Sequence, residues 1–309
     1  MIFIADAGGS TRTAALDAGP PAEPPPAPRP PPPLEFGPGS VRPGDAHPFR
    51  LAVALRAMRG SPSGVKIASL LSLLDLVAEA KTKTGVDPFV SGEWLLVYGP
   101  RAEVPGPNAN VLRHGKPEAE IARAVAAAGF EARDGGGGGG GVQASLYGVR
   151  EPLLRPQPGL LALVPADRAA DLSAALAQPV DPGVKAGELA RLFLAEPAKV
   201  LRIVPDEVVR ANAIAKPAAD GGLDLSADAD CGDAARCSDA ATRLGDFVAR
   251  QNSMMVRMLT RSLFSGLAFK ANGARLEATL HASPDQVEAI LSLLRAQLGL
   301  PPPPPAARP

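Results

Sequence analysis

The chain has 309 residues, of which 46% are hydrophobic and only 4% aromatic. A core can therefore form, and it must be built mainly from Leu, Val and Ala. The 32 basic and 32 acidic residues cancel to a net charge of zero. This balance argues against a general nucleic-acid binder, because such a protein needs excess positive charge to neutralise phosphates.

The first 47 residues are predicted to form a disordered, proline-rich tether. Ten of the fourteen residues from Pro20 to Pro33 are proline. Because proline fixes φ and lacks a backbone N–H, such tracts form extended, semi-rigid spacers. A second run, Pro301 to Pro305, begins a similar tail over residues 301–309. The sequence shows neither a signal peptide nor a membrane-spanning apolar stretch. If the protein is exported, its targeting segment is therefore missing from this chain.

Residues 48–180 are predicted as a first α+β half. Phe49 to Arg56 alternates apolar and polar residues, as a half-buried strand does, and residues 62–81 read as a strongly apolar helix. Seven consecutive glycines, Gly135 to Gly141, predict a mobile, hairpin-like loop. The other expected elements are strands at 94–98, 110–114, 130–133, 142–148 and 160–164, and helices at 117–128 and 166–177.

Residues 181–300 are predicted as a second half, which begins in a Pro- and Gly-containing boundary at 178–187. Asn272-Gly273 is a favourable hairpin turn. Ser283 has the pattern of an N-cap, with proline next and Gln286 three residues on, so a helix should run from there to Gly299. The other expected elements are strands at 189–194, 209–216, 223–229, 267–271 and 275–281, a short helix at 198–204 and a long helix at 233–264.

The order of these elements predicts an α+β fold, mainly antiparallel sheet with helices packed on one face. The series strand, helix, strands, helix, strands, helix occurs on both sides of residue 180, which suggests two similar halves. Residue identity between the halves is poor, so one continuous sheet with helices on one face is the alternative.

Cys231 and Cys237 are the two cysteines of the chain. Their spacing is that of neither a redox pair nor half of a usual zinc site, and no second Cys or His cluster accompanies them. A disulfide across this short loop would fit an oxidising compartment. Two reduced, partly buried thiols are the alternative.

A row of arginines marks the predicted long helix. Four are spaced by seven residues and the fifth lies four further on, so all share one helix face. This basic row consists of Arg236, Arg243, Arg250, Arg257 and Arg261. Such a face can dock onto anionic lipid headgroups or an acidic partner. A solvated helix face is the alternative.

Acidic residues alternate with apolar ones in the segment that contains Asp224, Asp228 and Asp230. This alternation predicts a solvated strand face. A calcium-binding EF-hand loop does not fit, because Asp233 stands where that loop requires glycine.

No set of catalytic residues converges in the sequence. The histidines His47, His114 and His281 are scattered, and the last two are expected at surface or edge positions of strands. Ser145 and Ser226 lack a nucleophile-elbow context. Asp87 and Glu93, six residues apart across a turn, are a candidate acid–base pair. The sequence therefore predicts no catalytic, metal-binding or cofactor-binding residue.

The segment Ile2 to Thr13 resembles the first phosphate motif of the sugar-kinase and actin-like ATPase superfamily. In that superfamily a strand ends in an acidic residue followed by a glycine pair and Ser or Thr. The resemblance implies that Asp6 would lie near a metal ion and that Gly8, Gly9 and Ser10 would line ATP phosphates.

Two functional hypotheses follow from these features. The first is a non-enzymatic protein of the bacterial cell envelope, periplasmic or outer-envelope associated, that serves as a tethered binding or scaffolding module. Its partner would be an envelope protein or an anionic membrane surface. The alternative is a nucleotide-dependent phosphotransferase, based on Asp6 to Ser10. An enzyme with a site around the glycine run is a third reading.

Overall fold

The computed structural model describes residues 40–44, 47–100, 107–128, 131–133, 141–146, 149–201, 204–251, 258 and 261–300. All of them belong to the compact unit Phe36–Pro309. Most of the predicted tether, the tail 301–309 and all but the last residue of the glycine run lie outside the described residues, as does the phosphate-motif segment.

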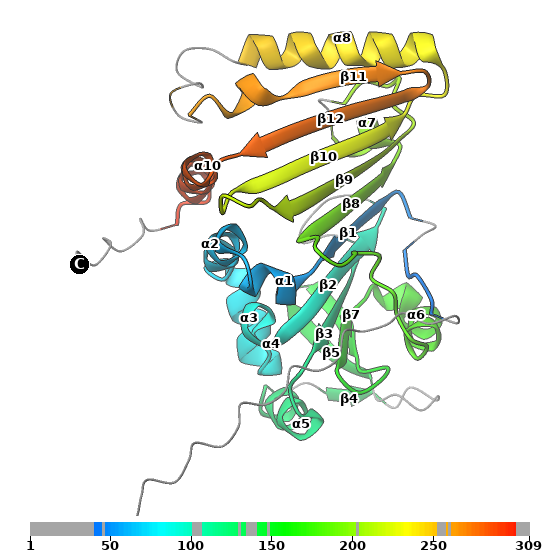
Figure 1. Cartoon of the computed structure of the whole chain (residues 1–309). Coiled ribbons are helices and arrows are strands. Elements are labelled where there is room, and N and C mark those ends of the chain that lie inside the picture. Colours follow the sequence, from blue (N-terminus) through cyan, green and yellow to red (C-terminus); the bar gives the residue numbers. More distant parts are fainter. Residues whose placement is uncertain are drawn as a thin grey trace, which may run out of the picture. The chain divides into compact units, whose positions relative to one another are not determined.

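One antiparallel sheet organises the fold (Figure 1). Its strand order is β11-β12-β10-β9-β8-β1-β2-β3-β7-β6-β5-β4. The strands are β1 (Phe49–Val53), β2 (Gly92–Gly99), β3 (Ala109–His114), β4 (Glu131–Arg133), β5 (Gly141–Leu146), β6 (Val149–Leu154), β7 (Leu160–Leu163), β8 (Ala190–Ala195), β9 (Arg210–Pro217), β10 (Leu223–Asp230), β11 (Ala268–Asn272) and β12 (Arg275–Ala282). The predicted α+β, mainly antiparallel class is confirmed.

The two halves of the sheet repeat one arrangement. β1 and β8 pair at the centre, with Leu51 opposite Leu192. Outward from that pair the order is β1-β2-β3-β7-β6-β5-β4 on one side and β8-β9-β10-β12-β11 on the other, so β5 and β4 extend the first side beyond the repeated arrangement. In each half a helix connects the third strand to the outer strands. The sheet is continuous across residue 180 because the central pair joins the halves.

The described helices are α1 (Leu55–Arg59), α2 (Pro62–Leu71), α3 (Asp75–Thr84), α4 (Pro88–Ser91), α5 (Glu118–Ala127), α6 (Ala169–Leu176), α7 (Pro197–Val200), α8 (Ala234–Gln251) and α10 (Pro284–Gln297), with 3-10 turns η1 (Ala166–Arg168) and η2 (Leu263–Gly266). All of them except η1 and α6 pack on one face of the sheet, here called the helical face. α6 covers the opposite face of the first half, over Trp94, Leu96 and Tyr98.

Several predicted boundaries are wrong for local reasons. The helix expected at 62–81 is two helices, and between them the Ser72 hydroxyl donates to the Ser69 carbonyl, a bond that competes with helix continuation. The strand expected at 49–56 ends at Val53, where α1 begins. The sequence reading missed β6 altogether.

The helix expected at 233–264 also ends early. Arg261 and Ser262 have φ values of 50° and 60°, which no α-helix accommodates. The capping box at Ser283 forms as predicted: the Ser283 hydroxyl accepts from the Gln286 N–H and the Gln286 side chain accepts from the Ser283 N–H.

The compact body begins before the predicted boundary at residues 47/48. Residues Ser40 to Gly44 form a strap along the segment that joins the two halves. The Val41 N–H donates to the Pro179 carbonyl at 2.8 Å, and the Asp181 N–H donates to the Val41 carbonyl at 2.9 Å. Arg42 pairs with the Asp181 carboxylate at 2.6 Å. Gly44 lies so close to Tyr98 that a Cβ would meet the ring at 2.6 Å.

Candidate functional site

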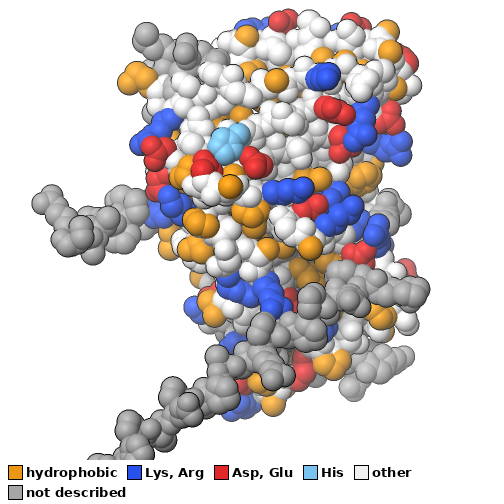
Figure 2. Space-filling view, in the orientation of Figure 1, with side chains coloured by type: hydrophobic (Ala, Val, Ile, Leu, Met, Phe, Trp, Pro, Cys, Tyr) orange, Lys and Arg blue, Asp and Glu red, His pale blue; other side chains and the backbone are white. Residues whose placement is uncertain are grey.

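The face opposite the helices is polar in the second half of the sheet. Asp224, Asp228 and Asp230 lie on it, as predicted for a solvated strand face. Each carboxylate has a partner on a neighbouring strand: Asp230 pairs with Arg210 at 2.8 Å, Asp228 with Arg275 at 3.4 Å and Asp224 with His281 at 2.8 Å. Figure 2 shows acidic and basic side chains interspersed over this face. Within the described residues no group of three or more acidic, His or Cys side chains is placed to hold a metal ion.

His281 bridges two carboxylates. Its Nδ1 lies 2.8 Å from Asp224 and its Nε2 lies 3.1 Å from Asp220. The hydrogen bond with Asp224, followed by that with Asp220, raises the pKa of His281. Sequence reasoning placed His281 correctly at the surface but missed Asp220, because that residue lies in the β9–β10 turn outside the strand alternation.

The prediction that His114 is a surface or edge residue is wrong. Its side chain is buried at the end of β3, on the helical face, near Glu118 of α5. Neither ring nitrogen has a well-aligned hydrogen-bond partner among the described residues, although the Lys116 backbone lies close enough to act on the ring. Burial lowers the pKa of His114, so the neutral ring is favoured.

His47 occupies a third, separate environment. Its Nε2 lies 2.6 Å from the Arg168 guanidinium, and its ring lies 5.4 Å from that of Tyr98. A guanidinium only donates, so Nε2 must be the unprotonated acceptor. Burial, and then the Arg168 charge, lowers the pKa of His47. The three histidines therefore do not converge on one site.

Three arginines of the basic row have partners within the described structure. The Arg236 guanidinium donates to the Asp206 carbonyl at 3.2 Å, and Arg243 pairs with Glu207 at 2.9 Å, so both hold α8 against the turn before β9. Arg261 leaves the row because its backbone is left-handed, and it pairs with Asp285 at 2.8 Å. Arg250 is exposed, and Arg257 lies outside the described residues.

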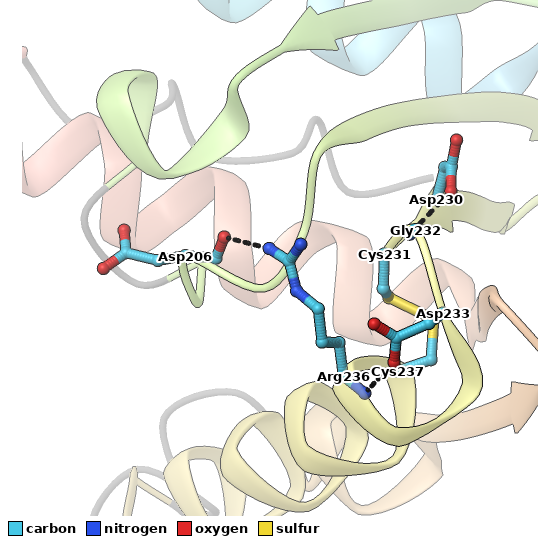
Figure 3. Close-up of a disulfide and its surroundings, with 7 residues drawn as sticks. All are labelled: Asp206, Asp230, Cys231, Gly232, Asp233, Arg236 and Cys237. Carbon is cyan, nitrogen blue, oxygen red and sulfur yellow. Dashed lines mark hydrogen bonds between the residues drawn. A yellow bond between two sulfur atoms is a disulfide. The ribbon is translucent and has the colours of Figure 1, made fainter.

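Cys231 and Cys237 are joined in a disulfide with an S–S distance of 2.17 Å and a Cα–Cα distance of 5.2 Å (Figure 3). Both are fully buried in a cluster that includes Ala240 and Leu276. Asp233 lies inside the bridged loop, where its carboxylate accepts from the Arg236 N–H at 2.8 Å. The disulfide thus fixes the N-terminal end of α8 to the end of β10.

Asp87 and Glu93, the candidate acid–base pair, both make structural contacts. Asp87 caps α4 by accepting from the Phe89 N–H at 3.0 Å and pairs with Lys81 at 3.1 Å. Glu93 lies 3.8 Å from Arg113. Ser226 faces the polar side of the sheet opposite Thr279. The described structure thus gives none of these candidates a catalytic setting.

The helical face contains a cavity of about 260 Å³ that sequence reasoning did not predict. Five neighbouring strands contribute to its floor: β1, β8, β9, β10 and β12. The lining residues are Leu51, Ala190, Leu192, Ala213, Ile214, Ala215, Leu225, Ser226, Ala227, Leu267, Ala278, Thr279 and Leu280. We call this cavity the apolar groove.

Helices border the apolar groove at both ends of its strands. α2 and α10 pack near the β9–β10 turn, around Leu223 and Leu280, and an ion pair of 2.9 Å between Lys66 and Glu288 connects these two helices. α7 and α8 pack at the other end, around Leu194 and Leu276. Within the described residues, the β8–β9 connection supplies one four-residue helix, whereas the β1–β2 connection supplies four helices.

The side chains that face the apolar groove are aliphatic. Ser226 and Thr279 are strand neighbours of Leu225 and Leu280, and because strand side chains alternate, their hydroxyls point to the polar face. None of the described residues that line the groove is titratable. Leu225 is 36% exposed in the middle of a strand, so this face is only partly covered.

Neither a protein-family model nor a curated protein matches this sequence. Among solved structures, the chain is similar to crystal form I of TP0453. The TM-score is 0.48 at 9% sequence identity, and the alignment covers 84% of this chain and 95% of that one. This likeness carries no information about ligands or residue roles. None of the helices in the described part of the chain is long and apolar enough to cross a membrane.

Proposed function

We propose that this protein is a non-enzymatic binding protein of the bacterial cell envelope and that it holds an apolar ligand in the apolar groove. The observation that carries the proposal is a cavity of about 260 Å³ that is lined by aliphatic side chains and, among the described residues, by no titratable group. Acid–base and nucleophilic catalysis need such groups at the site. Burial of apolar ligand surface needs only the aliphatic lining.

The size of the apolar groove also supports a binding role. An engineered cavity of roughly 150 Å³ with an aliphatic and aromatic lining is known to bind benzene, and pockets for small molecules span roughly 300–1,000 Å³. The groove volume of about 260 Å³ falls between these values. It is therefore large enough for one apolar group and smaller than a site for a large polycyclic ligand.

Binding is tested by titrating the protein with the fluorescent probe N-phenyl-1-naphthylamine. We expect saturable binding, and we expect Ala227→Leu to weaken it at least tenfold because the added side chain fills the groove. The control is Asp228→Asn, which changes the next residue along the strand, on the polar face and outside the groove lining, and should leave affinity unchanged. Absence of saturable binding, or equal affinity in Ala227→Leu and the unmodified chain, would refute the binding role.

The envelope location is supported by the Cys231–Cys237 disulfide, because disulfides persist mainly in oxidising compartments. It is tested by trapping thiols with an alkylating agent during extraction from cells and weighing the intact protein. We expect no alkylation of the unfolded protein without reductant and two additions after its reduction. Two additions without reductant would place the protein in a reducing compartment and would leave the binding role untouched.

A further inference from the structure

We infer that the ligand of the apolar groove is a single unbranched alkyl chain, which lies across the strands and keeps its polar end outside. This inference rests on the proposed binding function and specifies its ligand. Three features of the groove carry it: its length, the sizes of the side chains on its floor, and the absence of polar partners inside it.

The apolar groove is long for its volume. Its lining comes from β12, β10, β9, β8 and β1, which are consecutive neighbours in the sheet. With roughly 4.8 Å between neighbouring strands, the outermost two of these five lie about 19 Å apart. A volume of about 260 Å³ spread over that distance is narrow. An extended chain fits such a space, whereas a compact ring system or two parallel chains would not.

Alanines form the deepest part of the floor. Ala190, Ala213, Ala215, Ala227 and Ala278 project only a methyl group, while Leu192, Leu225 and Leu280 stand beside them as taller side chains. In β9 the alternation places Ala213 and Ala215 on the same face, so no large side chain interrupts the floor in the middle strand. The floor is thus a shallow channel with aliphatic walls.

The groove offers no side-chain hydrogen bond to a ligand. The hydroxyls of Ser226 and Thr279 point to the polar face, and the backbone amides and carbonyls of the floor are paired within the sheet. A carboxylate, phosphate or amine buried there would lose its hydration without compensation. The ligand must therefore place its methylene chain in the groove and its headgroup in solvent.

The experiment is competition of the bound naphthylamine probe with a homologous series of straight-chain fatty acids from six to eighteen carbons, used below their critical micelle concentrations. Affinity should rise about fourfold per added methylene and then reach a plateau when the groove is full. Replacing the carboxylate by trimethylammonium on a chain of equal length should change affinity less than threefold. A sterol and a two-chain phospholipid should compete at least tenfold less well than the best single chain.

The variant Ala278→Leu tests the direction of the chain across the strands. It blocks the β12 end of the groove, so the plateau should move to shorter chains while the fourfold slope below the plateau stays the same. Ala190→Leu blocks the opposite end and should do likewise, which keeps the test valid if one variant fails to fold. Glu277→Gln, on the polar face of the same strand and outside the groove lining, is the matched control and should leave the plateau in place.

The outcomes separate the two proposals. If no apolar probe binds saturably, the proposed binding function fails. If the probe binds but affinity does not depend on chain length, or a sterol or a two-chain lipid competes best, only the alkyl-chain inference fails. A large preference for one headgroup charge would likewise contradict the inference, because it requires a charged partner inside the groove.

Discussion

His114 is a buried titratable side chain without a well-aligned hydrogen bond, and such groups usually cost stability. Its surroundings include Glu118, which favours the charged ring, and Arg113 and Arg155, which disfavour it. Burial outweighs the carboxylate, so the folded protein binds a proton at His114 less readily than the unfolded chain does. Protonation at this position therefore favours unfolding.

We expect the free energy of unfolding to fall as the pH is lowered from 7 towards 5, and part of that fall to disappear in His114→Phe. The folded-state pKa of His114 lies below the usual value of 6.5, so stability is lost as the pH drops through that value towards the folded-state pKa. At pH 7 the variant should be within about 1 kcal/mol of the unmodified chain or more stable. Urea unfolding at several pH values measures both effects.

His47 and His281 serve as internal comparisons for this prediction. The pKa of His47 is also lowered, so its protonation adds to the loss of stability at low pH. The pKa of His281 is raised, so its two ion pairs strengthen as the pH falls through its folded-state pKa and oppose the loss. His281→Ala should therefore steepen the decline. An unchanged pH profile in His114→Phe would show that His114 does not contribute to it.

At the level of single residues, sequence alone anticipated the solvated acidic strand face and raised a Cys231–Cys237 disulfide as one alternative. Both features depend on local spacing along the chain. The sequence could not predict the burial of His114 or the pairing of His281 with Asp220. Those depend on which element packs over a strand end and on a turn that lies outside the strand alternation.

Among the elements, α8 has two sets of contacts with different roles. Its apolar side packs on β11 and β12, and its first turns are fixed by the disulfide, by Arg236 and by Arg243. Glu207, the partner of Arg243, is only 18% exposed, and one of its oxygens has no other partner in the described structure. Without Arg243, the Glu207 carboxylate would lose the ion pair that offsets the cost of its burial.

We predict that Arg243→Ala lowers the free energy of unfolding by about 1 kcal/mol, whereas Arg250→Ala, seven residues on and exposed, changes it by less than about 0.5 kcal/mol. Chemical denaturation of the two variants measures the difference. Both should bind vesicles rich in anionic lipid as the unmodified chain does. Equal loss of vesicle binding in both variants would support the prediction that the basic row docks onto an anionic membrane surface.

The elements themselves were largely predictable from the sequence, but their ends were not. The Ser283 capping box and the Asn272-Gly273 turn carry strong local signals, and the two strands and one helix that they flank form where expected. The break between α2 and α3 has a weaker signal, because Ser72 and its neighbours are compatible with a continuing helix. There, packing of α2 against α10 and of α3 against α5 decides the outcome.

For the whole molecule, the sequence predicted the α+β class and raised the similarity of the two halves. It did not predict the apolar groove, because the groove arises from side chains that five strands bring together. The alternating alanines of β9 were visible as a strand face, but nothing local indicates that they line a groove on the helical face. Long-range arrangement, and not propensity, determines this site.

At the same scale we predict different results for two N-terminal deletions. Removal of residues 1–39 should leave the melting temperature within about 1 °C, because a proline-rich segment of this composition contributes little burial. Removal of residues 1–47 should lower it by several degrees, because the strap contacts at Val41, Arg42 and Gly44 are lost. Scanning calorimetry distinguishes them, and identical melting temperatures would contradict the strap's role.

The position of the strap determines how the body would respond to mechanical force on its N-terminal side. The first described contacts join Val41 and Arg42 to residues 179–181, and the chain then enters β1, which is hydrogen-bonded to β8 on one side and β2 on the other. Tension applied ahead of Ser40 would therefore load the strap first and then the middle of the sheet. Because an edge strand would peel away far more easily than β1, this attachment suits a body that must stay folded while it is pulled.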